Sequence, residues 1–525
     1  MTVEPESDGS TAVGTGRATR TVSWLLFAML FVTFAYFFHA EAGWNVNSRI
    51  CLTYALVEKR TFAIDDYQKI ESLKTEDLAF FDGHYYSDKI IGTSLLGAIP
   101  MTALHGVARA VGHDFSWNVK RYVVTTFSVS LMGALAGVAL YRLLLCFGAS
   151  AAGAFFLVLA FVFGTQVFSV STVFLSYAPA LCFEILSYAM LVKHRETFDR
   201  RRLFIAGLAL GAALLCEYTV GIVAIGLSVY AMFHLKQKRS IVWYWLGAAV
   251  PLLPFLGYTM ACFGRPTIPY QYSVNPEFKE GMSQGFQGIV GFNPAVLYYI
   301  TIHRYRGLFY HSPFLALAAW GWIAIWRAKT GTGSVFPVAL QKQATGKSVP
   351  VPVFDAMLSI SMIAAYLVFN ASYYMWWGGW SNGPRHLIPA LPFLVMPLVW
   401  VWRGSRTGPT GPTGRTGRTI LIALFAVSFF FNTIPALVDA QIRQGYQAVE
   451  LYHPRLSYNY RDPLWELGIK EFWRGHLAAN AGQFLGLRGL WSLAPLGVVW
   501  VLAGAVAVRA TNCRHRTSTV SNPQM

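Results

Sequence analysis

Long apolar runs dominate this sequence and alternate with short polar or basic segments. Twelve runs approach the length of about 20 residues that a transmembrane helix needs, and they are 22–40, 121–146, 150–168, 175–193, 202–217, 218–234, 241–262, 310–326, 354–373, 386–402, 419–437 and 490–509. A thirteenth run, 92–111, is interrupted by Pro100 and carries His105 and Arg109, so we expect it to be interfacial or re-entrant. The pattern predicts an all-α polytopic membrane protein, a bundle of about 12 transmembrane helices.

Basic residues mark one side of these predicted spans. With the N-terminus in the cytoplasm, the cytoplasmic segments are 1–21, 142–149, 193–202, 235–240, 327–353, 403–418 and 509–525. Together these segments hold 22 of the 42 Lys and Arg but only 5 of the 25 Asp and Glu. Their excess of 17 basic residues equals the whole net charge of +17. This asymmetry follows the positive-inside rule, so we expect a multi-pass protein of the cytoplasmic membrane with both termini in the cytoplasm.

The composition excludes several other classes of protein. Charged residues make up 13% of the chain, about half of the roughly 25% usual in soluble domains. Six Cys are too few for a disulfide scaffold, and no CxxC or Cys/His zinc spacing occurs, so no metal site is predicted. The basic stretches are explained by topology and by contact with anionic membrane lipids, so no nucleic-acid partner is expected.

The predicted topology divides the chain into five parts and places the chemistry on the outer face. The parts are a cytoplasmic tail (1–21), a membrane core (22–402) with outer loops 41–120, 263–309 and 374–385, a Thr-Gly-Pro linker (403–418), a C-terminal membrane region (419–509) with outer loop 438–489, and a second cytoplasmic tail (510–525).

The first outer loop combines an amphipathic segment with a charged run. A helix on the membrane surface is predicted there by the apolar positions Ile50, Tyr54, Leu56 and Val57. Further on, the run GHYYSDK ends at Lys89, where the chain enters the apolar 90–111. A Lys at this depth can donate to a lipid phosphate, although a Lys at a helix end can also simply reach out to the membrane surface.

Two further loops carry aromatic and basic side chains. The loop YMWWGGWSNGPRHL places Trp377 and Trp380 beside Arg385. Indole rings suit the C–H face of a sugar and a guanidinium suits a phosphate, but Trp is also typical of the aromatic belt at a membrane surface. The loop HRYRGLFYHSP offers Arg304 and Arg306 as a second anion contact or as membrane-edge anchors.

The order of these motifs along the chain resembles that of a known class of enzymes. The motifs are Gly83–Lys89, Gly164–Thr165, RGLF at 306–309, WGGW at 377–380 and GPR at 383–385. Over most of residues 20–400 the chain is similar to bacterial membrane glycosyltransferases of the GT-C class, which include protein mannosyltransferases and the aminoarabinose transferases of lipid A. The resemblance implies transfer of a sugar, on the outer face, from a polyprenyl-phosphate carrier to a glycan, lipid or protein acceptor. It implies a lipid-linked sugar donor and no cofactor.

The resemblance also suggests where the substrate binds. In that class a Lys at the end of the first loop, usually followed by two Pro, holds the carrier phosphate. Lys89 matches this position, with Ile90-Ile91 in place of the prolines. Substrate contacts are therefore expected from Lys89, Arg385, His84, Tyr86, Asp88, Trp377, Trp380 and Arg306.

The usual acids of the class are absent from this chain. The acid pair after the first span corresponds to Asn45-Val46, and the acid near the fourth span corresponds to about Tyr177-Ala178. Other acids on the outer face must then serve as the general base, and they are Glu41, Asp65, Asp66, Asp82 and Asp88. Asp65 is preferred over Glu41, because the adjacent Asp66 should raise one pKa of the pair. Alternatively, Asp65 and Asp66 only cap a helix that starts near Tyr67.

The missing acids leave a second interpretation open. The chain can be a non-catalytic relative that binds or transports a polyprenyl lipid during assembly of the cell envelope. A transporter should contain inverted repeats with broken helices near the membrane midplane, and the sequence shows no repeat of that kind.

The charge asymmetry predicts the result of cysteine labelling. A Cys that replaces Gln284 should react with a membrane-impermeant maleimide added to intact cells, whereas a Cys that replaces Gln237 should react only after the membrane is opened. External labelling at position 237 would reverse the orientation.

Overall fold

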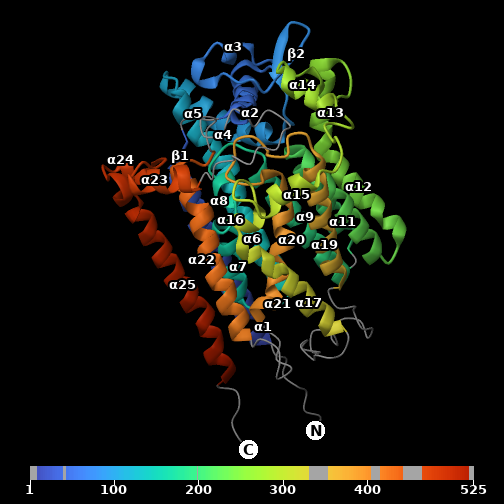
Figure 1. Cartoon of the computed structure of the whole chain (residues 1–525), viewed down its shortest axis with the longest axis vertical. Helices are drawn as coiled ribbons and strands as arrows, with labels where there is room; N and C mark the ends of the chain where they lie inside the picture. The colour runs from blue at the N-terminus through green and yellow to red at the C-terminus, as the bar shows by residue number, and fades with distance from the viewer. Residues whose placement is uncertain are drawn as a thin grey trace, which may run out of the picture.

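The protein is an all-α, membrane-embedded protein in the computed structural model, which describes residues 9–39, 43–197, 199–329, 353–403, 414–441 and 464–519 (Figure 1). Within these ranges, six helices are long and apolar enough to cross a membrane, and they are Gly92–Val111, Trp117–Cys146, Lys238–Phe263, Val353–Ser372, Arg415–Val438 and Gly489–Ala507. Four shorter apolar helices accompany them: Thr19–Ala35, Ala151–Phe163, Tyr218–His234 and Arg385–Val395. The other predicted spans coincide with helices that are shorter or less apolar, so the number of twelve remains a prediction.

The main helices run side by side as a bundle (Figure 1). They are α1 (Gly9–Ala35), α5 (Trp117–Thr125) continued by η3 (Thr126–Ser130) and α6 (Leu131–Cys146), α7 (Ala151–Phe163), α9 (Tyr177–Thr197), α10 (Arg200–Cys216), α11 (Gly221–His234), α12 (Ile241–Ala249), α13 (Leu253–Phe263), α17 (Ala318–Lys329), α19 (Val353–Ser372), α22 (Gly414–Val438) and α25 (Ala494–Thr519). The shorter helices are α8 (Val167–Val170), α15 (Pro294–Thr301), α16 (Leu308–His311), α20 (Leu391–Val395), α21 (Leu398–Arg403), α23 (Ile469–Trp473) and α24 (Ala481–Phe484). Helix α1 begins and helix α25 ends at the same end of the bundle.

The opposite end of the bundle carries a compact cap, which we define as residues 43–116 and 264–293 (Figure 1). It contains α2 (Trp44–Tyr54), η1 (Ala55–Lys59), α3 (Asp65–Gln68), α4 (Gly92–Val111), η7 (Pro269–Tyr272), α14 (Pro276–Ser283) and the strands β2 (Leu78–Phe81) and β3 (His84–Ser87). Two further short strands, β1 (Phe37–Phe38) and β4 (Ala479–Asn480), pair where α1 ends.

The first-loop helix exists but does not lie on a membrane surface. Ile50 and Tyr54 of α2 are fully buried inside the protein, so the apolar side of this helix packs within the cap. Helix α4 is continuous through Pro100 and is one of the six helices long enough to cross a membrane. The prediction that it does not cross therefore stays a prediction.

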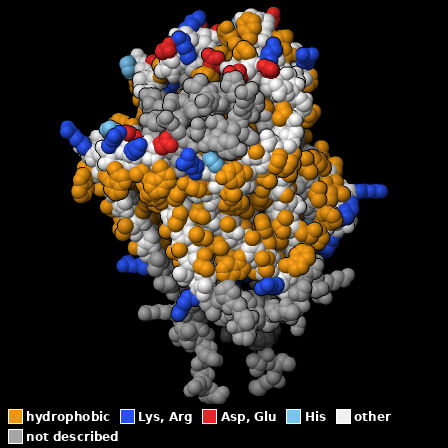
Figure 2. All heavy atoms as spheres, viewed as in Figure 1, with side chains coloured by type: hydrophobic (Ala, Val, Ile, Leu, Met, Phe, Trp, Pro, Cys, Tyr) orange, Lys and Arg blue, Asp and Glu red, His pale blue; other side chains and the backbone are white. Residues whose placement is uncertain are grey.

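An apolar band lies across the bundle below the cap. On the face shown in Figure 2, hydrophobic side chains cover the middle of the molecule, acidic and basic side chains lie above them, and Lys and Arg lie below. The exposed side chains of Leu253 and Val501 lie on helices long enough to cross a membrane, and that of Ile225 lies on the shorter helix Tyr218–His234. This distribution is that of a protein surrounded by lipid.

Helices α10 and α12 approach each other through glycines. A Cβ on Gly207 would collide with the carbonyl oxygen of Tyr244, and a Cβ on Gly247 would collide with that of Phe204. Small residues that let two backbones touch in this way are a common means of helix association in membranes.

This crossing predicts a stability difference between two glycine substitutions. Gly207→Ala should lower the thermal unfolding midpoint in detergent, because overpacking of this kind costs about 1–3 kcal/mol. Gly257→Ala on α13 is the control, since a Cβ there meets no atom within 4 Å. A midpoint for Gly207→Ala equal to that of Gly257→Ala would contradict this account of the crossing.

Candidate functional site

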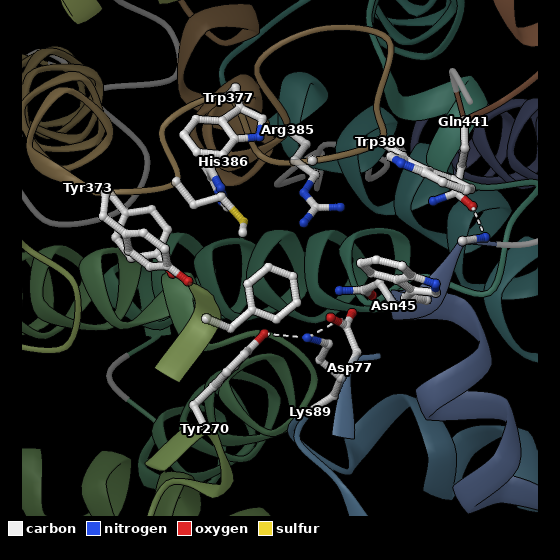
Figure 3. Close-up of a pocket in the computed structure, with 16 residues that line it drawn as sticks. Asn45, Asp77, Lys89, Tyr270, Tyr373, Trp377, Trp380, Arg385, His386 and Gln441 are labelled. Atoms are coloured by element: carbon white, nitrogen blue, oxygen red, sulfur yellow. Dashed lines mark hydrogen bonds and ion pairs between the residues drawn. The ribbon is translucent and has the colours of Figure 1, made fainter. Parts of the chain in front are cut away.

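A cavity of about 790 Å³, including its open mouth, lies between the cap and the end of the bundle (Figure 3). Segments distant in sequence line it: Gly43, Trp44, Asn45, Asp77, Lys89, Tyr270, Phe278, Tyr373, Tyr374, Met375, Trp377, Gly379, Trp380, Arg385, His386 and Gln441. Four predicted substrate contacts, Lys89, Arg385, Trp377 and Trp380, are among them.

One wall of the cavity holds a buried ion cluster. The Lys89 ammonium lies 3.0 Å from Asp77 Oδ2 and 3.1 Å from Asp88 Oδ1, and it donates to Tyr270 Oη at 2.6 Å. Only 5% of the Lys89 side chain is exposed. Two carboxylates therefore offset the charge of this Lys before any ligand arrives.

The hairpin β2–β3 builds this cluster. Asp82 and Gly83 form its turn with positive φ angles of 49° and 82°, as expected for an Asp-Gly hairpin turn. In the resulting register Leu78 faces Ser87, so Asp77 and Asp88 flank the open end of the hairpin. Burial raises the pKa of Asp88, and the Lys89 charge opposes that rise. Burial and the two carboxylates raise the pKa of Tyr270, which keeps the phenol neutral.

The opposite wall presents a cation. In Figure 3, Arg385 extends between Trp377 and Trp380 toward Asp77 and Lys89. Among the residues that the structure describes, its guanidinium has no hydrogen-bond or ion-pair partner, and its Nε is buried. Arg385 can therefore bind an anionic ligand without first breaking an ion pair with any of these residues.

The two glycines before Trp380 shape the loop around Arg385: both adopt left-handed conformations, and the first leaves room for the Arg385 side chain. Gly378 and Gly379 have φ angles of 72° and 65°, which favour glycine. A Cβ on Gly378 would come within 2.9 Å of Arg385 Cγ. The Gly-Gly pair thus serves the placement of Arg385.

Arg306 supports this loop and does not line the cavity, which corrects the expected anion contact. Its fully buried guanidinium donates to the carbonyl oxygen of Ser381 and, at 2.7 Å, to that of Gly379. It also lies 4.5 Å from the ring centroid of Tyr305. The predicted partner Arg304 is exposed.

Of the predicted bases that the structure describes, none lines this cavity: Asp65, Asp66, Asp82 and Asp88 all lie outside it. Asp65 Oδ1 accepts from the backbone N–H of Tyr85 at 3.0 Å, and Asp65 Oδ2 lies 3.2 Å from His84 Nδ1. Asp66 Oδ1 accepts from Lys69 at 2.9 Å, and this contact lowers the pKa of Asp66. The expected rise of one pKa in the Asp65-Asp66 pair is therefore not found at Asp66.

Three more predicted residues are placed as follows. His84 is exposed on β3, and Tyr86 packs against Phe263 at 5.5 Å between ring centroids. Glu41 lies outside the described residues.

Sequence reasoning missed several cavity residues. Asp77 was not a candidate because nothing in the linear pattern separates it from the other loop acids. Tyr270 lies 181 residues after Lys89, and only the fold brings the two together. Asn45, at one family acid position, does line the cavity, whereas Ala178, at the other, is fully buried.

Comparison of the sequence with protein-family models and with curated proteins finds no match. The fold and the cavity define an α-helical membrane protein with a polar, aromatic site at the junction of cap and bundle. The glycosyltransferase resemblance rests on the motifs alone.

Arg306 offers a test of how the loop is held. Arg306→Met should lower the thermal midpoint, because each buried carbonyl left without a donor costs about 1–3 kcal/mol. Arg304→Met, two residues away on an exposed position, should leave the midpoint unchanged. Equal midpoints for both variants, measured in the same detergent, would show that the loop does not depend on Arg306.

Proposed function

We propose that this protein is a glycosyltransferase that moves a sugar from a polyprenyl-phosphate carrier to an acceptor on the outer face of the cytoplasmic membrane. The observation that carries the proposal is the cavity wall on which the Arg385 guanidinium, which no described residue pairs with, lies between two indoles. A phosphate is a good partner for Arg385, and the rings of Trp377 and Trp380 suit the apolar face of a sugar.

The charges of the cavity give Arg385 and Lys89 different roles. Arg385 contacts the phosphate and stabilises the charge that develops there as the sugar departs. Lys89 was expected to make that contact, but its ammonium is already bound by Asp77, Asp88 and Tyr270. We therefore assign Lys89 to holding these side chains in place.

An apolar groove beside the cavity favours a lipid-linked donor. It spans about 1600 Å³, its open side included, between α11 and α19, and Ile289 and Ser372 are among its lining residues. The next residue, Tyr373, lines the cavity. A polyprenyl chain in the groove would leave its phosphate near the mouth of the cavity, an arrangement that a water-soluble sugar nucleotide does not need.

The orientation belongs to the proposal as well. Twelve spans with both termini in the cytoplasm put the cap on the outer face, because the excess of 17 basic residues then lies inside. The acceptor is a glycan, lipid or protein that reaches the cavity from that side.

Arg385 provides the test of carrier binding. Arg385→Ala should weaken binding of undecaprenyl phosphate by roughly one to two orders of magnitude, since a charge-assisted hydrogen bond contributes about 1.5–3 kcal/mol. Binding of undecaprenol, which lacks the phosphate, should not change. Arg109→Ala, an exposed cation on the cap helix α4, is the matched control.

The outcomes separate the two functional interpretations. Undecaprenyl phosphate affinity that is unchanged in Arg385→Ala would remove the proposed phosphate contact. Arg385-dependent binding without any sugar transfer would instead favour the non-catalytic lipid-binding protein.

A further inference from the structure

Transfer of a sugar to a hydroxyl group requires a proton acceptor in the cavity, and Asn45 cannot supply it. Arg49 is 3% exposed, and its Nη1 donates to Asn45 Oδ1 at 2.6 Å. Because Arg carries only donors, this contact fixes the amide oxygen toward Arg49. The Asn45 amide N–H₂ remains as a donor and has no lone pair that can take a proton at neutral pH.

Asp77 is the only carboxylate among the described residues that line the cavity. Its Oδ2 is bound to Lys89 at 3.0 Å, whereas its Oδ1 accepts no hydrogen bond from any described residue. Figure 3 shows the carboxylate pointing into the cavity from the wall opposite Arg385. One oxygen is therefore held and the other is available.

The surroundings keep this carboxylate fixed in position. Its backbone N–H donates to Thr75 Oγ1 at 3.0 Å, and its partner Lys89 is itself held by Asp88 and Tyr270. Asp88 is fully buried and does not line the cavity, so it is the structural member of the pair.

We propose that Asp77 is the general base of the transfer reaction, which deepens the proposed function and rests on it. The acceptor hydroxyl oxygen forms a bond to C1 of the sugar. The bond from C1 to the phosphate oxygen breaks, and its electron pair leaves with the lipid phosphate toward Arg385. The hydroxyl proton passes to Asp77 Oδ1 and is later released to water.

The experiment measures donor consumption in membranes that contain the full chain. Undecaprenyl-phosphate-linked glucose, mannose and arabinose are supplied, and released undecaprenyl phosphate is quantified. Asp77→Asn should lower turnover by roughly two to four orders of magnitude, the usual share of general-base catalysis, and should leave undecaprenyl phosphate binding unchanged. Retained binding shows that the variant is folded.

Three companion variants complete the test. Asp77→Glu should recover part of the turnover, because it restores a carboxylate. Glu76→Gln is the matched control and should keep wild-type turnover, because Glu76 is the exposed acid next to Asp77 in the sequence and does not line the cavity. Glu41→Gln tests the alternative base, the acid that lies nearest to the end of the first predicted span in the sequence.

Each outcome decides between stated alternatives. The role of Asp77 is overturned if Asp77→Asn keeps the turnover of the wild type, or if only Glu41→Gln loses it. The proposed function stands in both cases. Absence of both donor consumption and undecaprenyl phosphate binding in the wild type overturns the proposed function itself. Binding of undecaprenyl phosphate without consumption of any donor identifies a lipid-binding protein. In that case there is no transfer reaction, and the role of Asp77 as its general base is overturned as well.

Discussion

The ammonium of Lys89 between the carboxylates of Asp77 and Asp88 is the interaction on which the cap depends. The Asp82-Gly83 turn fixes the register of the hairpin, and that register carries both acids to its open end. Like charges placed together are destabilising, so a buried cation has to lie between them. The removal of one partner from a buried ion cluster typically costs about 3–5 kcal/mol. The hairpin and its closing Lys therefore form one electrostatic unit.

The facing wall is built by a different constraint, the backbone conformation of a short loop. Gly378 and Gly379 adopt φ values that other residues avoid, and Arg306 satisfies the carbonyl groups that this loop turns inward. Arg385 is left with its guanidinium toward the cavity. The two walls thus differ in charge: one carries acids held by a Lys, and the other a cation that no described residue neutralises. Such a polarised cavity can bind a phosphate on one side and activate a hydroxyl on the other.

Much of the candidate site was accessible from the sequence, because motif chemistry identifies residue types well. Lys89, Arg385, Trp377 and Trp380 were predicted to act together, and the fold brings them to one cavity. Asp65, which the sequence analysis preferred as the base, does not line that cavity. A loop acid is known from sequence by its charge, but the direction of its side chain depends on the hairpin beside it, where Asp65 binds the backbone of β3.

The sequence by itself determined that the protein is a helical membrane protein, because hydrophobic length and the distribution of Lys and Arg are local properties of the chain. It also identified the loops that bring Lys89, Arg385, Trp377 and Trp380 to the cavity. Only the tertiary structure decided which charges are already neutralised and which are free. Asp77 and Tyr270 reach Lys89 from segments distant in sequence, while Arg385 meets no acid among the described residues. Charge compensation acts through space over a few ångströms, and the order of residues along the chain does not record those distances.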